Sequence, residues 1–223
     1  MGFLIKLKGK KLKDIDLYLE VAVDNIIDGK LIAFPTDSVY GIGGDPLNTE
    51  VIERIFEIKF RDRKKGLLLL VADYGEAAKI AQFNNMADTL VKHYWPGQLT
   101  LILNRSESCI IPEEISAFQN TLGIRVPENE IILSILEKLK ARGRFGGIIG
   151  TSANYSGEPP SISGDEVARK FLSPIDFIID GGKSKSKKST TIVDCTSQEP
   201  KFLRIGVISD EDVLDVLKIS KND

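Results

Sequence analysis

The chain has 223 residues, which suits one large domain or two small ones. Thirty Lys and Arg against 32 Asp and Glu leave a formal net charge of −2, which argues against nucleic-acid binding through a global positive field. No apolar run approaches the ~20 residues that span a bilayer and the N-terminus lacks the features of a signal peptide, so we expect a cytoplasmic protein without membrane contact.

Helical and strand patterns alternate along the first part of the chain, and strands cluster later. Residues 17–27 carry apolar side chains at helical spacing and stop before Gly29, whereas 67–72 is a continuous apolar run, typical of a strand covered on both faces. In chain order we expect a helix over 17–27, strand 31–34, helix 48–58, strand 67–72, helices 76–81 and 86–94, strands 99–103 and 122–126, helix 131–140, strand 147–151, helix 166–171, strands 177–179, 191–193 and 202–205, and helix 211–217.

This order of elements predicts an α/β (α+β) fold: a twisted mixed sheet, with parallel and antiparallel strands, and helices packed on it. There is no internal repeat and no break in composition, so we expect a single domain over 1–223. One segment is of low complexity. Residues 181–189 read GGKSKSKKS, which predicts a mobile loop.

The segment 34–45, FPTDSVYGIGGD, points most directly to a ligand site. An apolar strand stops at a proline, and the hydroxyl of Thr36 and the carboxylate of Asp37 precede a small-residue loop. Glycines let the backbone approach a ligand, and the cations Lys59 and Arg61 follow after one predicted helix. The glycine spacing matches neither the dinucleotide fingerprint nor the P-loop. The pattern therefore indicates an anion site of another kind.

Five cations fall within positions 59–65, directly before an apolar strand. Lys59 and Arg61 end a predicted helix, where cations are also stabilised by the helix dipole without any ligand. Such a dense cluster suits a triphosphate. Taken singly, Arg63, Lys64 and Lys65 are more typical of surface charges.

One strand end and two strand interiors supply further polar side chains. Ser152 and Asn154 follow the strand 147–151, where they are either turn formers or ligand contacts at a sheet edge. Arg125 and Arg204 each lie in an otherwise apolar strand and need a partner, which is either a structural carboxylate or an anionic substrate. An α-carboxylate suits the bidentate fork of Arg125.

Metal-ligating residues are scarce. Cys109 and Cys195 are far apart without metal-type spacing, and His93 is the only histidine. We therefore expect no protein metal site, and a histidine-based catalytic dyad would rest on one residue.

Taken together, nine segments resemble the YrdC/Sua5 family of L-threonylcarbamoyladenylate synthases. The resemblance covers about 17–206, and it is the shared order of the segments that makes it specific. Differences from the usual family pattern are Gln98 and Ile205, each in place of proline, and the lysine-rich loop 181–189. The segments are FPTDSVYGIGGD (34–45), Lys59 with Arg61, KGLLLLVA (65–72), WPGQLTLIL (95–103), LGIRVP (122–127), TSANYSG (151–157), IIDGG (178–182), STTIVD (189–194) and FLRIG (202–206).

The resemblance implies a nucleotidyltransferase that converts L-threonine, bicarbonate and ATP with Mg²⁺ into L-threonylcarbamoyl-AMP and pyrophosphate. The product would pass to a downstream transferase for the t6A modification of tRNA. The resemblance also implies a short form, without the C-terminal domain of longer members. It assigns catalysis to Lys59 and Arg61; threonine binding to Thr36, Arg125, Gly150 and Ser189; and ATP binding to Lys59, Arg61, Arg63, Thr121, Ser152, Asn154 and Arg204.

Two alternatives stay open. The first is a non-catalytic relative that binds double-stranded RNA or tRNA on a basic concave face made by the cations of 59–65 and 183–188; the net charge counts against it, but patches act locally. The second is a relative that adenylates a different carbamate. The loop 181–189 would either close on ATP or contact tRNA.

Overall fold

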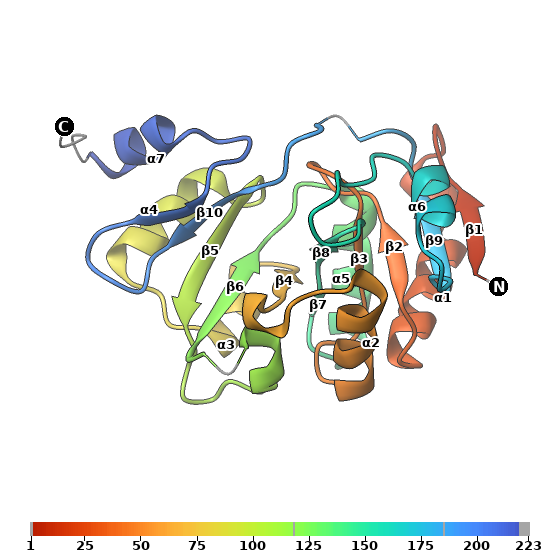
Figure 1. Ribbon diagram of the computed structural model, residues 1–223, viewed down its shortest axis with the longest axis horizontal. Coiled ribbons are helices and arrows are strands. Elements are labelled where there is room, and N and C mark those ends of the chain that lie inside the picture. Colours follow the sequence, from red (N-terminus) through yellow and green to blue (C-terminus); the bar gives the residue numbers. More distant parts are fainter. Residues whose placement is uncertain (1, 118, 185, 219–223) are drawn as a thin grey trace.

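The computed structural model describes residues 2–117, 119–184 and 186–218, so Lys185 of the predicted loop lies outside the described residues. Its strands form two sheets that lie side by side, with helices packed on them (Figure 1). The predicted α/β class with mixed strand directions is confirmed. The strands are divided between two sheets rather than forming one.

The first sheet is parallel on one side and antiparallel on the other. Strands β1, β9 and β2 run parallel, and β3 pairs antiparallel with both β2 and β8. The order across this sheet is β1 (Phe3–Lys6), β9 (Phe177–Asp180), β2 (Ile32–Phe34), β3 (Gly41–Gly43) and β8 (Thr151–Ser152).

Strand β3 was predicted as a flexible glycine loop, and that expectation is wrong. Gly41 and Gly43 are paired and buried because their missing side chains permit close packing. A Cβ on Gly41 would lie 2.6 Å from the Phe34 ring, and one on Gly43 would lie 1.6 Å from the Ile149 carbonyl oxygen. The glycines therefore allow close contact with the neighbouring strand β2 and with β7 (Gly147–Ile149) of the second sheet, rather than backbone motion.

The second sheet has six strands. Strands β5 and β10 pair in parallel, as do β4 and β6, and the other pairs are antiparallel. The chain leaves this sheet after β7 and enters the first at β8, with Gly150 between them. The order is β11 (Lys201–Arg204), β10 (Thr191–Asp194), β5 (Leu99–Asn104), β6 (Thr121–Arg125), β4 (Leu68–Val71) and β7 (Gly147–Ile149).

The helices cover the outer surfaces of the sheets (Figure 1). Helices α1 and α5 pack on each other, and α7 packs on α4. Within the described part of the chain, no helix combines the length and apolar character needed to cross a membrane. The helices are α1 (Asp16–Ile27), α2 (Thr49–Lys59), α3 (Tyr74–Ile80), α4 (Asn85–Tyr94), α5 (Glu130–Ala141), α6 (Gly164–Lys170) and α7 (Asp210–Leu217), with 3₁₀ turns at Leu12–Asp14, Arg63–Lys65 and Glu113–Ser116.

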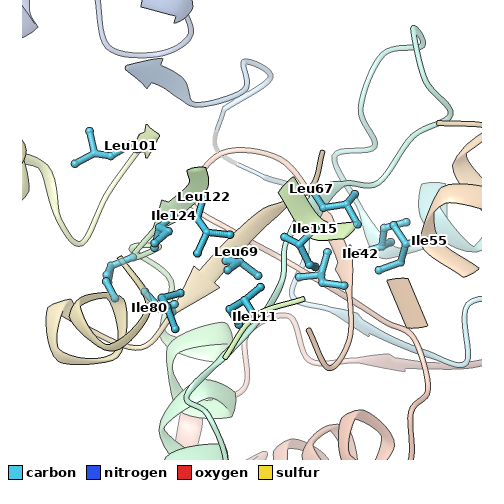
Figure 2. Close-up of a cluster of buried hydrophobic side chains, with 14 of the residues drawn as sticks. Ile42, Ile55, Leu67, Leu69, Ile80, Leu101, Ile111, Ile115, Leu122 and Ile124 are labelled. Atoms are coloured by element: carbon cyan, nitrogen blue, oxygen red, sulfur yellow. The ribbon is translucent and has the colours of Figure 1, made fainter. Parts of the chain in front are cut away.

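Buried apolar side chains form one core that spans both sheets and another beneath α1 and α5. In the first, Ile42 of β3 and Ile55 of α2 lie beside Leu67 and Leu69, and the same cluster continues to Ile124 of β6 (Figure 2). Because one close-packed apolar cluster joins the sheets, residues at the edge where the sheets meet are held in fixed positions relative to each other.

Helix α2 is capped at its N-terminus by Asn48. The Asn48 side chain accepts hydrogen bonds from the backbone N–H groups of Glu50 and Val51 at 2.9 and 3.3 Å. We expect Asn48→Ala to lower the free energy of unfolding by about 1 kcal/mol, because two helix-terminal donors lose their acceptor. Urea unfolding of the wild type, Asn48→Ala and Asn48→Asp checks this, since aspartate keeps the acceptor. Equal losses in the two variants would contradict the capping role.

Candidate active site

A cleft opens where the two sheets meet. Residues from both sheets and from the connections between them line it: Thr36, Ser38, Val39, Tyr40, Gly41, Arg61, Leu70, Arg125, Gly150, Thr151, Ser152, Ser189, Thr190 and Arg204. Hydroxyl groups and three guanidinium groups dominate this lining. No carboxylate belongs to it, and the described residues contain no cluster of side chains suited to hold a metal ion. Its chemistry therefore suits an anionic ligand.

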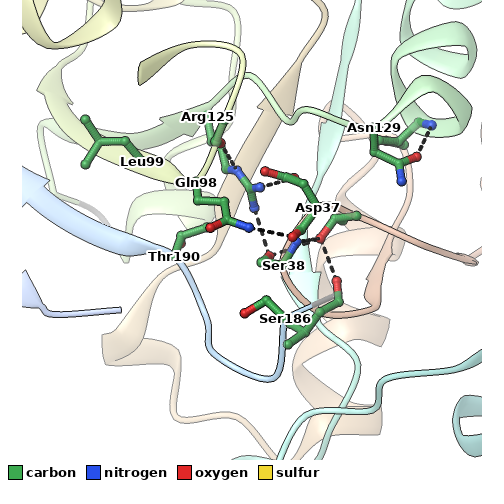
Figure 3. Close-up of polar contacts among 12 residues, drawn as sticks. Asp37, Ser38, Gln98, Leu99, Arg125, Asn129, Ser186 and Thr190 are labelled. Atoms are coloured by element: carbon green, nitrogen blue, oxygen red, sulfur yellow. Dashed lines mark hydrogen bonds and ion pairs between the residues drawn. The ribbon is translucent and has the colours of Figure 1, made fainter. Parts of the chain in front are cut away.

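Arg125 ends β6 and is 5% exposed. Its Nε donates to the Gly97 carbonyl at 2.7 Å, one terminal nitrogen donates to Ser38 Oγ at 3.2 Å, and the other forms an ion pair with Asp37. Figure 3 shows the guanidinium group between Asp37 and Ser38. Burial lowers the pKa of Arg125, and the carboxylate of Asp37 opposes that shift. The partner that the sequence required is thus a carboxylate of the loop after β2.

The loop after β2 is shaped by its own hydroxyl groups. Thr36 Oγ1 donates to the Val39 carbonyl at 2.6 Å and accepts from the Ser38 N–H at 3.1 Å. The two hydroxyl oxygens of Thr36 and Ser38 lie 3.0 Å apart. This local turn holds both hydroxyl groups at the cleft, next to Arg125.

Arg61 reaches the cleft because α2 ends abruptly. Phe60 has a left-handed backbone (φ 49°), and the Arg61 N–H bonds back to the Phe56 carbonyl at 2.9 Å. This reversal directs the chain away from the helix axis. The Arg61 side chain then donates to the carbonyl groups of Gly66 and Lys65, both at 2.9 Å. Its guanidinium group is therefore fixed by main-chain acceptors and forms no ion pair with a carboxylate in the described part of the chain. Burial lowers the pKa of Arg61, and the nearby charge of Asp62 opposes that shift.

Arg204 approaches from the edge strand β11. Its Nε and a terminal nitrogen donate to the carbonyl and hydroxyl oxygens of Thr190, both at 2.9 Å. Burial lowers the pKa of Arg204, and repulsion from Arg125 and Arg61 adds to the shift. Arg204 thus lies close enough to Arg125 and Arg61 for their charges to repel it, and an anion in the cleft would relieve that repulsion.

Lys59 lies beneath the cleft rather than in its lining. It is 1% exposed, and its Nζ donates to the carbonyl groups of Ser152 and Asn154 at 2.5 and 2.6 Å. Burial, and then repulsion from Arg61 and Lys170, lowers the pKa of Lys59 to about 7. The lysine therefore holds the main chain at the end of β8 and in the segment that follows it.

The buried Lys59 makes stability depend on pH. Its native pKa of about 7 lies below the ordinary value of 10.5, so between these limits the unfolded chain holds a proton that the native chain has released. The free energy of unfolding therefore rises with pH across this window, relative to a variant without the amine. Between pH 7 and 9, we expect the free energy of unfolding of wild type to rise by about 2 kcal/mol more than that of Lys59→Met. Urea unfolding of both proteins at the two pH values measures this, and parallel profiles would contradict it.

The cleft contains most, but not all, of the predicted site residues. Thr36, Arg61, Arg125, Gly150, Ser152, Ser189 and Arg204 all line it. Asn154 and Lys59 lie next to it without lining it. Thr121 begins β6, at the end of the strand opposite Arg125, and Arg63 pairs with Glu53 on the surface. The assigned roles of these residues stay predictions.

Sequence reasoning missed Ser38, Tyr40 and Thr190. Ser38 and Tyr40 stand within the segment 34–45, and Thr190 within 189–194, so the segments were identified without these members. The Tyr40 hydroxyl oxygen lies 2.7 Å from the Gly182 carbonyl oxygen and 3.0 Å from Asp180 Oδ1, and its single proton can be donated to either acceptor. Burial, and then the charge of Asp180, raises the pKa of Tyr40. The tyrosine thereby ties the first part of the lysine-rich loop to the cleft.

Comparison with known proteins yields a consistent picture. The family model Sua5_yciO_yrdC, described as "Telomere recombination", matches residues 24–206. Threonylcarbamoyl-AMP synthase of Pyrococcus abyssi is 36% identical over 89% of this chain and 57% of its own length. Threonylcarbamoyl-AMP synthase of Bacillus subtilis is 31% identical over 83% of this chain and 52% of its own length.

The same likeness holds in three dimensions. The crystal structure of P. abyssi Sua5 complexed with L-threonine superposes with a TM-score of 0.87 at 33% identity, covering 97% of this chain and 61% of that one. The chain thus spans little more than half the length of these relatives. The matched family model, the fold and the order of the cleft segments agree: the chain belongs to the Sua5/YciO/YrdC family.

Proposed function

We propose that this protein synthesises L-threonylcarbamoyl-AMP from L-threonine, bicarbonate and ATP, with release of pyrophosphate. The observation that carries the proposal is the convergence of Arg61, Arg125 and Arg204 on one cleft that hydroxyl groups line. Relatives named for this activity, and one relative solved with L-threonine, support the choice of substrate.

The proposed reaction needs positioning and charge neutralisation more than proton transfer. The amine of threonine combines with bicarbonate, loses water and becomes a carbamate. A carbamate oxygen then attacks the α-phosphorus of ATP, and the bond to the β-phosphate oxygen breaks as pyrophosphate leaves. Cations that face the developing charge lower the barrier to this step. His93, the only histidine, lies with α7 residues in another cavity and takes no part.

The roles of the arginines follow from their partners. Arg125 sits with Thr36 and Ser38, so we assign to it the carboxylate of threonine. Arg61 and Arg204 bind main-chain carbonyl groups and have no ion pair with a carboxylate among the described residues, so their charge is available to the phosphates of ATP. The proposed reaction, which transfers AMP from ATP to the carbamate, is a nucleotidyl transfer.

Magnesium would enter with the nucleotide. The lining of the cleft contains no carboxylate, and Mg²⁺ commonly binds through substrate phosphates and water with few protein ligands. The residues therefore fit an ion held by ATP itself. When bound, it would neutralise charge on the phosphates.

The product would pass to a downstream transferase for the t6A modification of tRNA. Direct contact with tRNA is the second candidate, through the lysine-rich loop and the cations after α2. Arg63 is paired with Glu53, which removes one cation from that surface. The expected cytoplasmic location stays a prediction.

The deciding experiment is pyrophosphate release from Mg²⁺-ATP, with threonine and bicarbonate each omitted in turn. Release that requires both supports the proposal. Release with another amine in place of threonine would indicate a different carbamate. An inactive protein with tight tRNA binding that falls steeply with salt would instead support the RNA-binding alternative.

A further inference from the structure

Asp37 is the carboxylate that pairs with a cleft arginine. Among the ion pairs of the described residues, Asp37 with Arg125 is the only one that involves Arg61, Arg125 or Arg204. The two side chains are 9% and 5% exposed. The second carboxylate oxygen, Oδ2, is buried without a hydrogen-bond partner, so Arg125 alone balances this charge. A buried pair of this kind specifies a geometry more than it stabilises a fold.

Asp37 stands behind Arg125 as seen from the cleft. Arg125 lines the cleft, whereas Asp37 does not. Asp37 instead lines a second cavity of about 640 Å³, which Gln98 also lines. A ligand in the cleft therefore faces the guanidinium group, and the ion pair with Arg125 is the contact through which Asp37 can act on that ligand.

The backbone of Asp37 is fixed as firmly as its side chain. The Gln98 side-chain amide donates to the Asp37 carbonyl at 2.5 Å, and the neighbouring Gly97 carbonyl accepts from Arg125 Nε at 2.7 Å (Figure 3). Gln98 immediately precedes β5 of the second sheet, and Asp37 follows β2 of the first. The loop that carries the carboxylate is thus held against the strand end that carries the arginine.

Arg125 has N–H donors that its contacts within the protein do not use. A guanidinium group has five N–H donors, and the contacts with Gly97, Ser38 and Asp37 use three of them. Two donors remain for a ligand. Their direction depends on which nitrogen Asp37 holds, because the guanidinium group is planar and rigid.

We propose that Asp37 is a positioning residue, which holds the Arg125 guanidinium so that its two remaining donors face the carboxylate of the amino-acid substrate. This inference rests on the proposed function. Asp37 would set the affinity for threonine, and it would leave the affinity for ATP unchanged because Arg61 and Arg204 do not contact it. The acceptor oxygen of Asp37, more than its charge, provides the orientation.

The test compares Asp37→Ala with Asp37→Asn in the pyrophosphate-release assay. Asp37→Ala should raise the KM for threonine at least about tenfold, with the KM for ATP changed less than about twofold, since a misdirected guanidinium loses charge-assisted hydrogen bonds. Asp37→Asn keeps an acceptor oxygen and should recover most of the affinity for threonine. Calorimetric titration of threonine gives the same comparison without turnover.

Asp176→Asn is the matched control. Asp176 pairs with Arg54 in a half-buried ion pair away from the cleft, so this variant reports the effect of losing an ion pair on stability alone. Its KM for threonine should stay within about twofold of wild type. An unchanged threonine KM in folded Asp37→Ala overturns the inference, as does an equal rise for threonine and ATP or a loss in Asp37→Asn as large as in Asp37→Ala. Inactive wild-type protein would instead refute the proposed function.

Discussion

Arg61→Ala is expected to slow threonine-dependent pyrophosphate release on the order of 10²–10³-fold. The Arg61 guanidinium group is held by the Gly66 and Lys65 carbonyl groups, lines the cleft and forms no ion pair among the described residues. Its charge is therefore available to the departing pyrophosphate. The loss should appear in kcat more than in the KM for threonine, because the interaction strengthens as charge develops.

Arg63→Ala is the matched control for this prediction, because the surface ion pair with Glu53 leads us to expect little effect despite the ATP contact that the family resemblance implies for Arg63. It removes the same side chain two positions later, but Arg63 is paired with Glu53 on the surface and does not line the cleft. Its rate should stay within about twofold of wild type, since surface ion pairs contribute little. Steady-state kinetics of both variants over a range of ATP concentrations separates kcat from KM. Equal effects of the two substitutions would refute the role of Arg61 and point to a general basic surface.

Arg125→Lys is expected to lower kcat/KM for threonine by about 100-fold, which corresponds to roughly 2.7 kcal/mol of lost transition-state stabilisation. Lysine keeps the charge and can still pair with Asp37. It cannot reproduce the contacts to Gly97 and Ser38 together with two donors for a carboxylate, because an ammonium group lacks the planar fork.

The substitution should spare the other substrate and the fold. The dissociation constant of ATP, measured by titration, should stay close to wild type, because Arg61 and Arg204 are unchanged. Thermal unfolding should show a folded variant, since a cation still opposes Asp37, with a lower Tm because Gly97 and Ser38 lose their donor. A KM for ATP that rises as much as the KM for threonine would contradict the assignment of Arg125 to threonine. A variant as active as wild type would show that the fork has no part in binding.

Most predicted elements agree with the structure where an apolar pattern defines them, but strand β1 was not predicted and the predicted strand 147–151 is divided at Gly150 into β7 and β8. Strand β4 is an uninterrupted apolar run, and helix α2 has a cap, an apolar face and a cation at its end. Strand β3 could not be predicted in this way, since glycines have no strand preference and its pairing depends on Phe34 and Ile149. The division into two sheets follows from the crossing at Gly150, which no local pattern encodes.

The site could be predicted as a set of segments but not as a set of contacts. Arg125 stood out because a charge in an apolar strand needs a partner, yet Asp37 lies 88 positions earlier in the chain. Lys59 and Arg61 have similar sequence contexts, but their side chains lie in different places relative to the cleft. The helix end at Phe60 sends one side chain under the cleft and the other into it, and this direction depends on a backbone reversal that sequence spacing does not reveal.

A substrate bound in the cleft would connect the two sheets, because the cleft lies where they meet. Thr36 and Ser38 come from the first sheet, whereas Arg125 and Arg204 come from the second, so a ligand that contacts both sets ties two strand systems together. Such a ligand stabilises the native chain in proportion to the logarithm of its concentration above the dissociation constant. Amide hydrogens in β2 and β6 would then become protected from exchange together, although no hydrogen bond joins these strands directly.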